Sequence, residues 1–305
     1  MKKNLGPFYV APMTLWIMAF VIAPISIIIV YSFMTKHFRG GAIPPYTLDA
    51  YRNLFNPVFL KVTLNTLWVA FVSTIVMVAL AIPASYFMAR SKYKNFFLLL
   101  VIIPFWTNFM IRIFAWREIL GSRGFLNNML MTLGLIEQPV QFLFNTNAVI
   151  FITIYAYLPF AILPLYSTIE KFDFSLLEAA RDLGASKFTA IRRVLFPNIR
   201  AGITTAVLFT FIPAFGSYAI PNLIGGNDSY MLGNLIGHEL NIARNYPLAS
   251  SMSVVLTLLT MVGVLIFMRV NRSSVEAVRE DSGKQAAEPA QKAAAAPASG
   301  AEVSE

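Results

Sequence analysis

The chain has 305 residues, of which 57% are hydrophobic and only 13% are charged. This balance excludes an ordinary soluble globular protein and is typical of a chain that lies in a membrane. The formal net charge of +9 does not indicate nucleic-acid binding, because the basic residues are dispersed along the boundaries of apolar windows.

The residue inventory also limits the chemistry of the chain. It contains no cysteine, which excludes thiol catalysis, disulfides and cysteine metal sites. Its two histidines, His37 and His238, stand alone in predicted loops, and this favours solvated histidines over a metal site. The sequence offers no paired catalytic motif, so we predict a protein that is not an enzyme and that binds no metal.

Six windows without charged residues are long enough, or nearly so, to cross about 30 Å of hydrocarbon as helices. We predict membrane spans at about residues 11–34, 64–89, 96–116, 147–168, 203–225 and 248–270. The third window ends at Arg112, which we expect to snorkel to the headgroups from a helix end. The predicted fold class is an all-α integral membrane protein with six transmembrane helices, and residues 1–272 form its membrane domain.

The distribution of basic residues predicts the orientation. With six spans, 16 of the 24 Lys and Arg residues fall on one side of the membrane and 8 on the other. The positive-inside rule places the larger set, and with it both termini, in the cytoplasm.

The connections on the outer side contain apolar residues at helical spacing. Residues 47–55 predict a short interfacial helix, and residues 125–133 predict an amphipathic helix along the membrane surface. Residues 225–247 resemble this second segment. The last two segments either dock a partner or cap the helix bundle, whereas the first is either a solvated loop or a contact for substrate.

Several prolines fall inside the predicted spans. A broken helix is tolerated in lipid where protein or a water-lined cavity satisfies the freed backbone groups. Several prolines in one small bundle favour a lined transport pathway, although each alone is also compatible with a packing kink. They include Pro24, Pro83, Pro104, Pro159, Pro164, Pro213 and Pro221.

Between the fourth and fifth spans lies a charged cytoplasmic insert, residues 170–200. Ser175 and Glu178 form a capping-box pattern, which predicts a helix from Leu176 with an apolar stripe of Leu176, Ala180 and Leu183. Gly184 fits the left-handed position that ends this helix. Ser186 is expected to cap a second short helix with a stripe of Phe188, Ile191 and Leu195, which ends near Pro197. The alternative is an amphipathic loop that rests on the bilayer.

The insert resembles a known motif. The stretch EAARDLGASKFTAIRRVLFP, residues 178–197, matches the cytoplasmic EAA loop of bacterial ABC-importer permeases, with Val194 and Phe196 as mild departures from the common pattern. The stretches PFWTNFMIRIFAW, GFLNNMLMTLGLIEQP, YAYLPFAILPLYSTIEKFD and FIPAFGSYAIPNLIGG are similar to spermidine/putrescine permease subunits, and the likeness covers most of residues 8–270.

This resemblance implies a type I ABC importer permease in the bacterial inner membrane. The expected partners are a second similar permease, two cytoplasmic ATPase subunits and a periplasmic polyamine-binding protein. The EAA loop would seat in a groove of the ATPase and couple it to transport through Glu178, Ala179, Ala180, Gly184 and Pro197. Since the chain has no G-x-x-x-x-G-K-[ST] phosphate loop, ATP and Mg²⁺ are expected on the partner ATPase, and this chain is expected to bind no cofactor.

A polyamine carries several positive charges, yet the six windows contain no acidic residue. If the cargo is a polyamine, this subunit must contact it through aromatic faces and neutral oxygens, and any carboxylates must come from a partner. The alternative role of these residues is helix packing and the aromatic belt. The candidates are Trp106, Asn108, Tyr155, Tyr157, Tyr218 and Asn222.

Two other functions stay open. The same machinery with another cargo, such as iron, sulfate, thiamine or an aminophosphonate, is the nearest alternative. An ion-coupled secondary transporter fits less well, because no acidic residue in the spans would bind a coupling proton. Residues 273–305 are rich in Ala, Pro, Ser and Glu, and we predict a disordered cytoplasmic tail.

Overall fold

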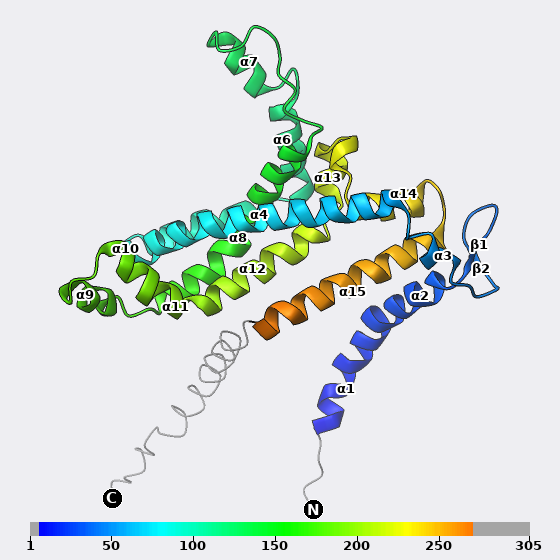
Figure 1. Ribbon diagram of the computed structural model, residues 1–305, viewed down its shortest axis with the longest axis horizontal. Helices are drawn as coiled ribbons and strands as arrows, with labels where there is room; N and C mark the ends of the chain where they lie inside the picture. Colours follow the sequence, from blue (N-terminus) through cyan, green and yellow to red (C-terminus); the bar gives the residue numbers. More distant parts are fainter. Residues whose placement is uncertain (1–5, 271–305) are drawn as a thin grey trace, which may run out of the picture.

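The computed structural model describes residues 6–270, and these are almost entirely helical (Figure 1). The predicted tail, residues 273–305, lies outside the described residues. The first half of the fold consists of α1 (Gly6–Ile17), the π-helical turn η1 (Met18–Ile22), α2 (Ala23–Ser32), α3 (Asp49–Arg52), α4 (Pro57–Arg90), α5 (Lys94–Ile102), the 3₁₀ turn η2 (Ile103–Trp106), α6 (Phe109–Leu120) and α7 (Phe125–Thr132). A small antiparallel hairpin, β1 (Thr35–Lys36) with β2 (Ala42–Ile43), is an addition to the predicted all-α fold.

The second half begins with the long helix α8 (Thr146–Glu170). It is followed by α9 (Ser175–Asp182), α10 (Lys187–Ala190), the π-helical turn η3 (Ile191–Leu195), α11 (Phe196–Asn198), α12 (Arg200–Phe215), α13 (Ala219–Ile224), the 3₁₀ turn η4 (Asn227–Ser229), α14 (Leu232–Asn241) and α15 (Tyr246–Val270).

Between residues 6 and 270, four helical stretches are long and apolar enough to cross a membrane without a break: Val10–Ser32, Pro57–Arg90, Thr146–Glu170 and Tyr246–Arg269. Two further candidates are bent pairs. Lys94–Trp106 and Phe109–Thr132 meet at 90°, and Lys187–Asn198 and Arg200–Phe215 meet at 70°. The number of spans reaches the predicted six if each bent pair crosses the membrane once.

The predicted spans at 96–116 and 203–225 are therefore not continuous helices. The first stops at Thr107, whose hydroxyl donates to the Pro104 carbonyl at 2.7 Å, and restarts after Asn108. The second stops at Phe215 and restarts at Ala219. Each interruption follows a proline by a few residues, whereas α4 and α8 continue through their internal prolines.

The centre of the fold is a layer of three helices, α4, α8 and α12, which pack along most of their lengths (Figure 1). Small residues at the contacts, including Ala81 on α4, Ala161 on α8 and Ala206 on α12, are fully buried and allow close approach of the backbones. Interhelical hydrogen bonds add to this packing, and the Ser85 hydroxyl on α4 donates to the Ile162 carbonyl on α8 at 3.1 Å. This layer supports the short helices at its two ends.

The first and last spans lie outside this layer. None of the most apolar 18-residue window of Val10–Ser32 is buried within the chain, and only 11% of that of Tyr246–Arg269 is. Figure 1 shows α1 pointing away from the bundle, with α2 reaching α15. Exposed apolar surface of this kind is satisfied by lipid or by another membrane subunit.

Candidate coupling loop and translocation face

The helix pair α9–α10 extends beyond the ends of the central layer (Figure 1). Its first helix does not begin with the predicted capping box, because α9 has no side-chain hydrogen bond at its N-cap. Instead, Asp173 Oδ1 accepts from the backbone N–H of Ser175 at 3.0 Å. Hydrogen bonds from the Ser175 side chain and backbone hold the pKa of the Asp173 carboxyl below its ordinary value.

The turn between the two helices has the predicted glycine geometry. Gly184 has φ +89°, and its N–H donates to the Arg181 carbonyl at 2.9 Å while the Ala185 N–H donates to the Ala180 carbonyl at 3.0 Å. These paired bonds form a Schellman motif, which ends the helix at this position. Ser186 Oγ accepts from the Thr189 N–H at 3.2 Å, so the predicted cap of the second helix is confirmed.

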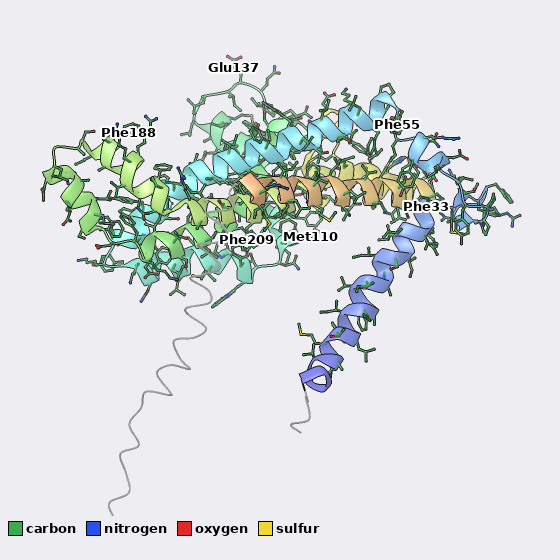
Figure 2. All side chains as sticks on the ribbon, turned by 60° about the horizontal axis from the view of Figure 1, so that its bottom comes forward. Phe33, Phe55, Met110, Glu137, Phe188 and Phe209 are labelled. Carbon is green, nitrogen blue, oxygen red and sulfur yellow. The ribbon has the colours of Figure 1, made fainter. Side chains whose placement is uncertain are left out.

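The apolar side of the pair differs from the prediction. Leu177 in α9 is buried with Ala190 and Leu195, and together with Ile169 and Ile199 they form a small core at the ends of α8 and α12. The predicted stripe residues Leu183 and Phe188 are instead 90% and 73% exposed. Two large apolar side chains therefore flank the turn at its outer surface, where Figure 2 shows Phe188 at the end of the molecule opposite Phe55.

The predicted coupling residues lie on or near this surface. Glu178, Ala179 and Gly184 are exposed, and Ala180 is half-buried against the small core. Pro197 is exposed in α11, just before the 70° bend into α12. An open hollow lies at the turn, lined by Glu178, Arg181, Asp182, Gly184, Ala185, Ser186 and Lys187.

Contacts at its base hold the pair to the membrane helices. The Arg90 guanidinium at the end of α4 lies 5.4 Å from the centroid of the Phe174 ring, which precedes α9. Lys94 Nζ, at the start of α5, lies 2.7 Å from Glu170 Oε1 at the end of α8. This anchoring and the small core argue against a loop that merely rests on the bilayer, since the helix pair packs as part of the fold.

The two interrupted spans meet beside α8. Both α6 and α13 contact α8 and each other, and Phe109, in the first turn of α6, stacks on Tyr157 of α8 at 6.0 Å between ring centroids. Tyr157 also packs in the cores on either side. Asn108 caps α6, since its Oδ1 accepts from the Met110 N–H at 2.8 Å.

The structure brings only some of the predicted pathway residues together. Asn108, Tyr157 and Tyr218 lie at or beside the two interruptions, whereas Tyr155 packs on Trp116, 5.2 Å between ring centroids, away from Tyr157. Trp106 is 81% exposed beside the first interruption. Asn222 is exposed on α13.

Sequence reasoning missed the role of α14 at the second interruption. A Cβ added at Gly233 would lie 2.5 Å from the Ser217 carbonyl oxygen, and one added at Gly237 would lie 2.6 Å from Cε2 of Tyr218. The two glycines are four residues apart, on one side of a helix, and let α14 lie directly on the interrupted backbone. The four-residue spacing of these glycines was the sequence signal that could have predicted this close contact.

Arg112 also lies elsewhere than predicted. It is not at the end of a continuous span but in the first turns of α6, directly after the interruption. Its guanidinium lies 5.6 Å from the Phe105 ring centroid and 5.8 Å from that of Phe109. The expected snorkelling at a helix end is therefore replaced by contact with two aromatic rings inside the broken span.

In the connections predicted to face outward, the helix expected at 47–55 is present as the shorter α3, and the helix expected at 125–133 is present as α7. In α7 the polar Asn127 is fully buried and bonds Gly121 and Val140, whereas the apolar Phe125 and Leu133 are exposed. Figure 1 shows α7 projecting from the bundle. This exposed apolar side is compatible with either a membrane surface or a docked protein.

Known proteins resemble the chain in both sequence and fold. The family model described as binding-protein-dependent transport system inner membrane component matches residues 5–280. The spermidine/putrescine transport system permease protein PotB of Haemophilus influenzae is 39% identical over 84% of this chain and 91% of that protein. PotB of Escherichia coli K12 is 37% identical over 84% of this chain and 94% of that protein.

A solved bacterial ABC transporter involved in the import of the acidic polysaccharide alginate has a chain that superposes with a TM-score of 0.75. The alignment covers 89% of this chain and 96% of that chain at 19% identity, so the likeness concerns the fold alone. Together with the family model, it confirms the predicted type I ABC importer permease fold.

Proposed function

We propose that this chain, which belongs to the binding-protein-dependent transport system inner membrane component family, is a permease subunit of an ATP-driven polyamine importer. The observation that carries the proposal is the identity of 37–39% with spermidine/putrescine permeases across 84% of this chain. The fold likeness to an alginate importer carries no information about the cargo. Cargo assignment therefore depends on the sequence relatives and on the chemistry of the pathway.

The assembly that this function requires has a second permease of similar fold, two ATPase subunits and a periplasmic binding protein that delivers the cargo. ATP with Mg²⁺ binds the ATPase subunits, and this chain contributes no catalytic residue and binds no cofactor. The chain crosses the inner membrane with both termini in the cytoplasm, as the distribution of its basic residues favours.

The α9–α10 turn is the surface that docks on the ATPase. Ala179 and Gly184 are small and let the ATPase approach closely, and Glu178 adds a charged contact. The exposed Leu183 and Phe188 provide apolar surface that the ATPase buries. Large apolar side chains that are this exposed, at the end of a membrane protein, indicate a surface that contacts another protein rather than water. Ala180 and Pro197 hold the turn and the bend behind it in shape.

The turn acts as a rigid lever. Closure of the ATPase pair around ATP moves the turn, and the small core of Leu177, Leu195 and Ile199 carries this movement to the start of α12. Because α12 ends at the interruption beside Tyr157 and Tyr218, its movement changes the opening between α6, α8 and α13. Alternation of this opening between the two sides of the membrane moves the cargo.

The cargo contacts lie along the same opening. Asn108, Tyr157 and Tyr218 offer neutral oxygens and aromatic faces at the two interruptions, and Trp106 offers a further exposed ring. Cations bind such faces with energies of about 0.5–2 kcal/mol each. Tyr155 and Asn222 are assigned a weaker role, since Tyr155 packs on Trp116 and Asn222 is exposed on α13.

The test uses the complete complex in liposomes with its cognate binding protein. We expect ATP-dependent accumulation of radiolabelled spermidine or putrescine that requires the binding protein. In parallel, the purified binding protein is screened by calorimetry against polyamines, oxyanions and metal ions. Binding of an oxyanion or metal ion, without binding of any polyamine, would refute the cargo while leaving the family unchanged.

A further inference from the structure

Arg112 is a cationic side chain deep in the membrane. Its neighbour rings mark its depth: Phe105 lies 5.1 Å from Phe160 and Phe109 lies 6.0 Å from Tyr157, between centroids. Tyr157 and Phe160 are about 17 and 21 Å along α8 from its outer end, at 1.5 Å per residue. Since α8 has 25 residues, or about 37 Å, Arg112 lies near the middle of the membrane.

Arg112 has no anionic partner in the described part of the chain. The ion pairs among residues 6–270 do not include it, and its buried Nε has no hydrogen-bond partner. All nine acidic residues of that range lie outside the predicted spans. The nearest in sequence, Glu118, is six positions further along α6 and therefore on a different side of the helix.

The two rings offset much of the cost of this burial but leave the buried Nε without a hydrogen-bond partner. Each aromatic face gains about 0.5–2 kcal/mol, against a cost of about 2.5–3.5 kcal/mol or more for an arginine at mid-membrane. A charged residue at this depth faces a cavity or pairs with another charge. The described part of the chain offers no such charge, so a negative charge that pairs with Arg112 comes from outside it.

We infer that Arg112 pairs, across the transport pathway, with a carboxylate of the second permease subunit, and that the cationic cargo competes with it for that carboxylate. This inference rests on the proposed polyamine cargo. In the empty transporter the guanidinium neutralises the carboxylate. When an ammonium group of the cargo takes that carboxylate, Arg112 moves onto the rings of Phe105 and Phe109, which is its position in this structure.

This exchange keeps the carboxylate paired with one cation or the other as each ammonium group passes. A bare carboxylate would hold a polyamine too tightly for release, and transport requires a site that binds and releases. Competition by Arg112 weakens the site without removing its selectivity for cations. The predicted spans of this chain contain no acidic residue, so in this arrangement this chain supplies the competing cation and the second permease supplies the carboxylate.

The absence of cysteine from this chain allows a direct test. Arg112→Cys is assembled with cysteine-free partner subunits, and the thiol is modified with a cationic trimethylammonium-ethyl or an anionic sulfonatoethyl methanethiosulfonate. Removal of the guanidinium leaves the carboxylate unpaired, so we expect the cationic reagent to react at least about tenfold faster than the anionic one. Spermidine should slow the cationic reaction. Arg117→Cys, which also removes a positive charge from α6, should have similar rates with both reagents.

Transport kinetics provide a second, independent readout. Arg112→Gln should lower both KM and kcat for spermidine, because the unopposed carboxylate binds cargo more tightly and releases it more slowly. Arg112→Lys keeps the charge and should stay within about threefold of the unmutated complex. A purely structural role would lower kcat or assembly without lowering KM.

Several results would overturn the inference. These are equal rates at position 112, faster reaction with the anionic reagent, no reaction with either reagent because the thiol faces lipid, and a raised KM in Arg112→Gln. Spermidine import by the unmutated complex is measured in parallel. Its failure refutes the proposed cargo, and the charge preference at position 112 still decides whether the carboxylate is there.

Discussion

The substitution Gly184→Asp separates a structural role of the turn from a docking role. Gly184 has φ +89°, and a Cβ built on it meets no atom of the chain within 4 Å. Within this chain the only cost of the substitution is therefore that of a side chain in the left-handed backbone conformation, about 1–2 kcal/mol. This cost is lower for Asp and Asn, which tolerate the conformation. The turn should still form.

Docking changes the expected magnitude. If the turn seats in a groove of the ATPase, the added side chain overpacks the contact by about 1–3 kcal/mol. An unpaired carboxylate removed from water adds several kcal/mol more. A total loss of about 4 kcal/mol lowers the affinity for the ATPase by about a thousandfold. We therefore expect spermidine uptake and its coupling to ATP hydrolysis to be abolished while membrane insertion stays intact.

The assay combines three measurements on the same membranes: the amount of inserted chain, ATPase subunits that copurify with it, and ATP-dependent uptake. Gly134→Asp is the matched control, because Gly134 also has positive φ (+69°) and open space around a Cβ, but follows α7 on the side predicted to face outward. Normal uptake by Gly184→Asp, or an equal defect in Gly134→Asp, would refute the assignment of the turn to ATPase docking.

Three further predictions concern stability and the outer surface. Thr66 Oγ1 accepts from the buried Leu232 N–H at 2.9 Å, so Thr66→Val should lower the free energy of unfolding by about 1–3 kcal/mol. Thr66→Ser keeps the hydroxyl and should preserve the thermal stability in detergent. Equal thermal stability of the two variants contradicts this role of the hydroxyl. Asn127 Nδ2 donates to the Gly121 and Val140 carbonyls at 3.0 and 2.9 Å. Asn127→Asp removes both donors and should increase the rate of proteolysis within residues 121–140 several-fold. The control, Asn128→Asp at an exposed position, should be cleaved at the rate of the unmutated chain. A Cβ at Gly202 would lie 2.5 Å from Thr168 Oγ1, so Gly202→Val should force α12 from α8 and destabilise the chain by about 1–3 kcal/mol. Thr168→Ala should restore part of this loss, and Gly263→Val, at an open position of α15, should have little effect.

The unbroken spans were predictable because apolar length and flanking charge are local properties. The predicted spans 147–168 and 248–270 differ by only a few residues from α8 and α15. The interruptions were not predictable, because Pro83 and Pro159 lie in continuous helices while Pro104 and Pro213 precede breaks. The difference lies in the residues after each proline: Thr107 and Asn108 bond the freed backbone ends at one break, and Gly216 comes directly after α12 at the other.

The EAA loop was predictable in its turn but not in its buried side. Gly184 and Ser186 act through bonds to residues a few positions away, which a sequence pattern can identify. Helix α9 has only eight residues, too few for periodicity to select the buried side. Leu177 is buried because Leu195 and Ile199 lie against it, and these contacts depend on the tertiary fold.

The setting of Arg112 was hidden for a similar reason. The sequence places Arg112 near the end of the predicted span 96–116, because the uncharged window stops there while residues 113–116 continue the apolar pattern. Its depth depends on the contacts of Phe105 and Phe109 with α8, more than 40 residues away. Such contacts have no signature in a single sequence.

The two glycines of α14 have a consequence for how information crosses the membrane. Because Gly233 lies against the backbone of Ser217 and Tyr218 and Gly237 lies against the Tyr218 ring, the second interruption cannot move without moving α14. Thermodynamic linkage makes this relation symmetric. In the proposed importer, a protein that binds α14 would therefore change the balance of states at the far end of the chain by the same free energy with which ATP binding there changes the position of α14. Docking of the loaded binding protein would then be linked to the nucleotide sites on the opposite side of the membrane.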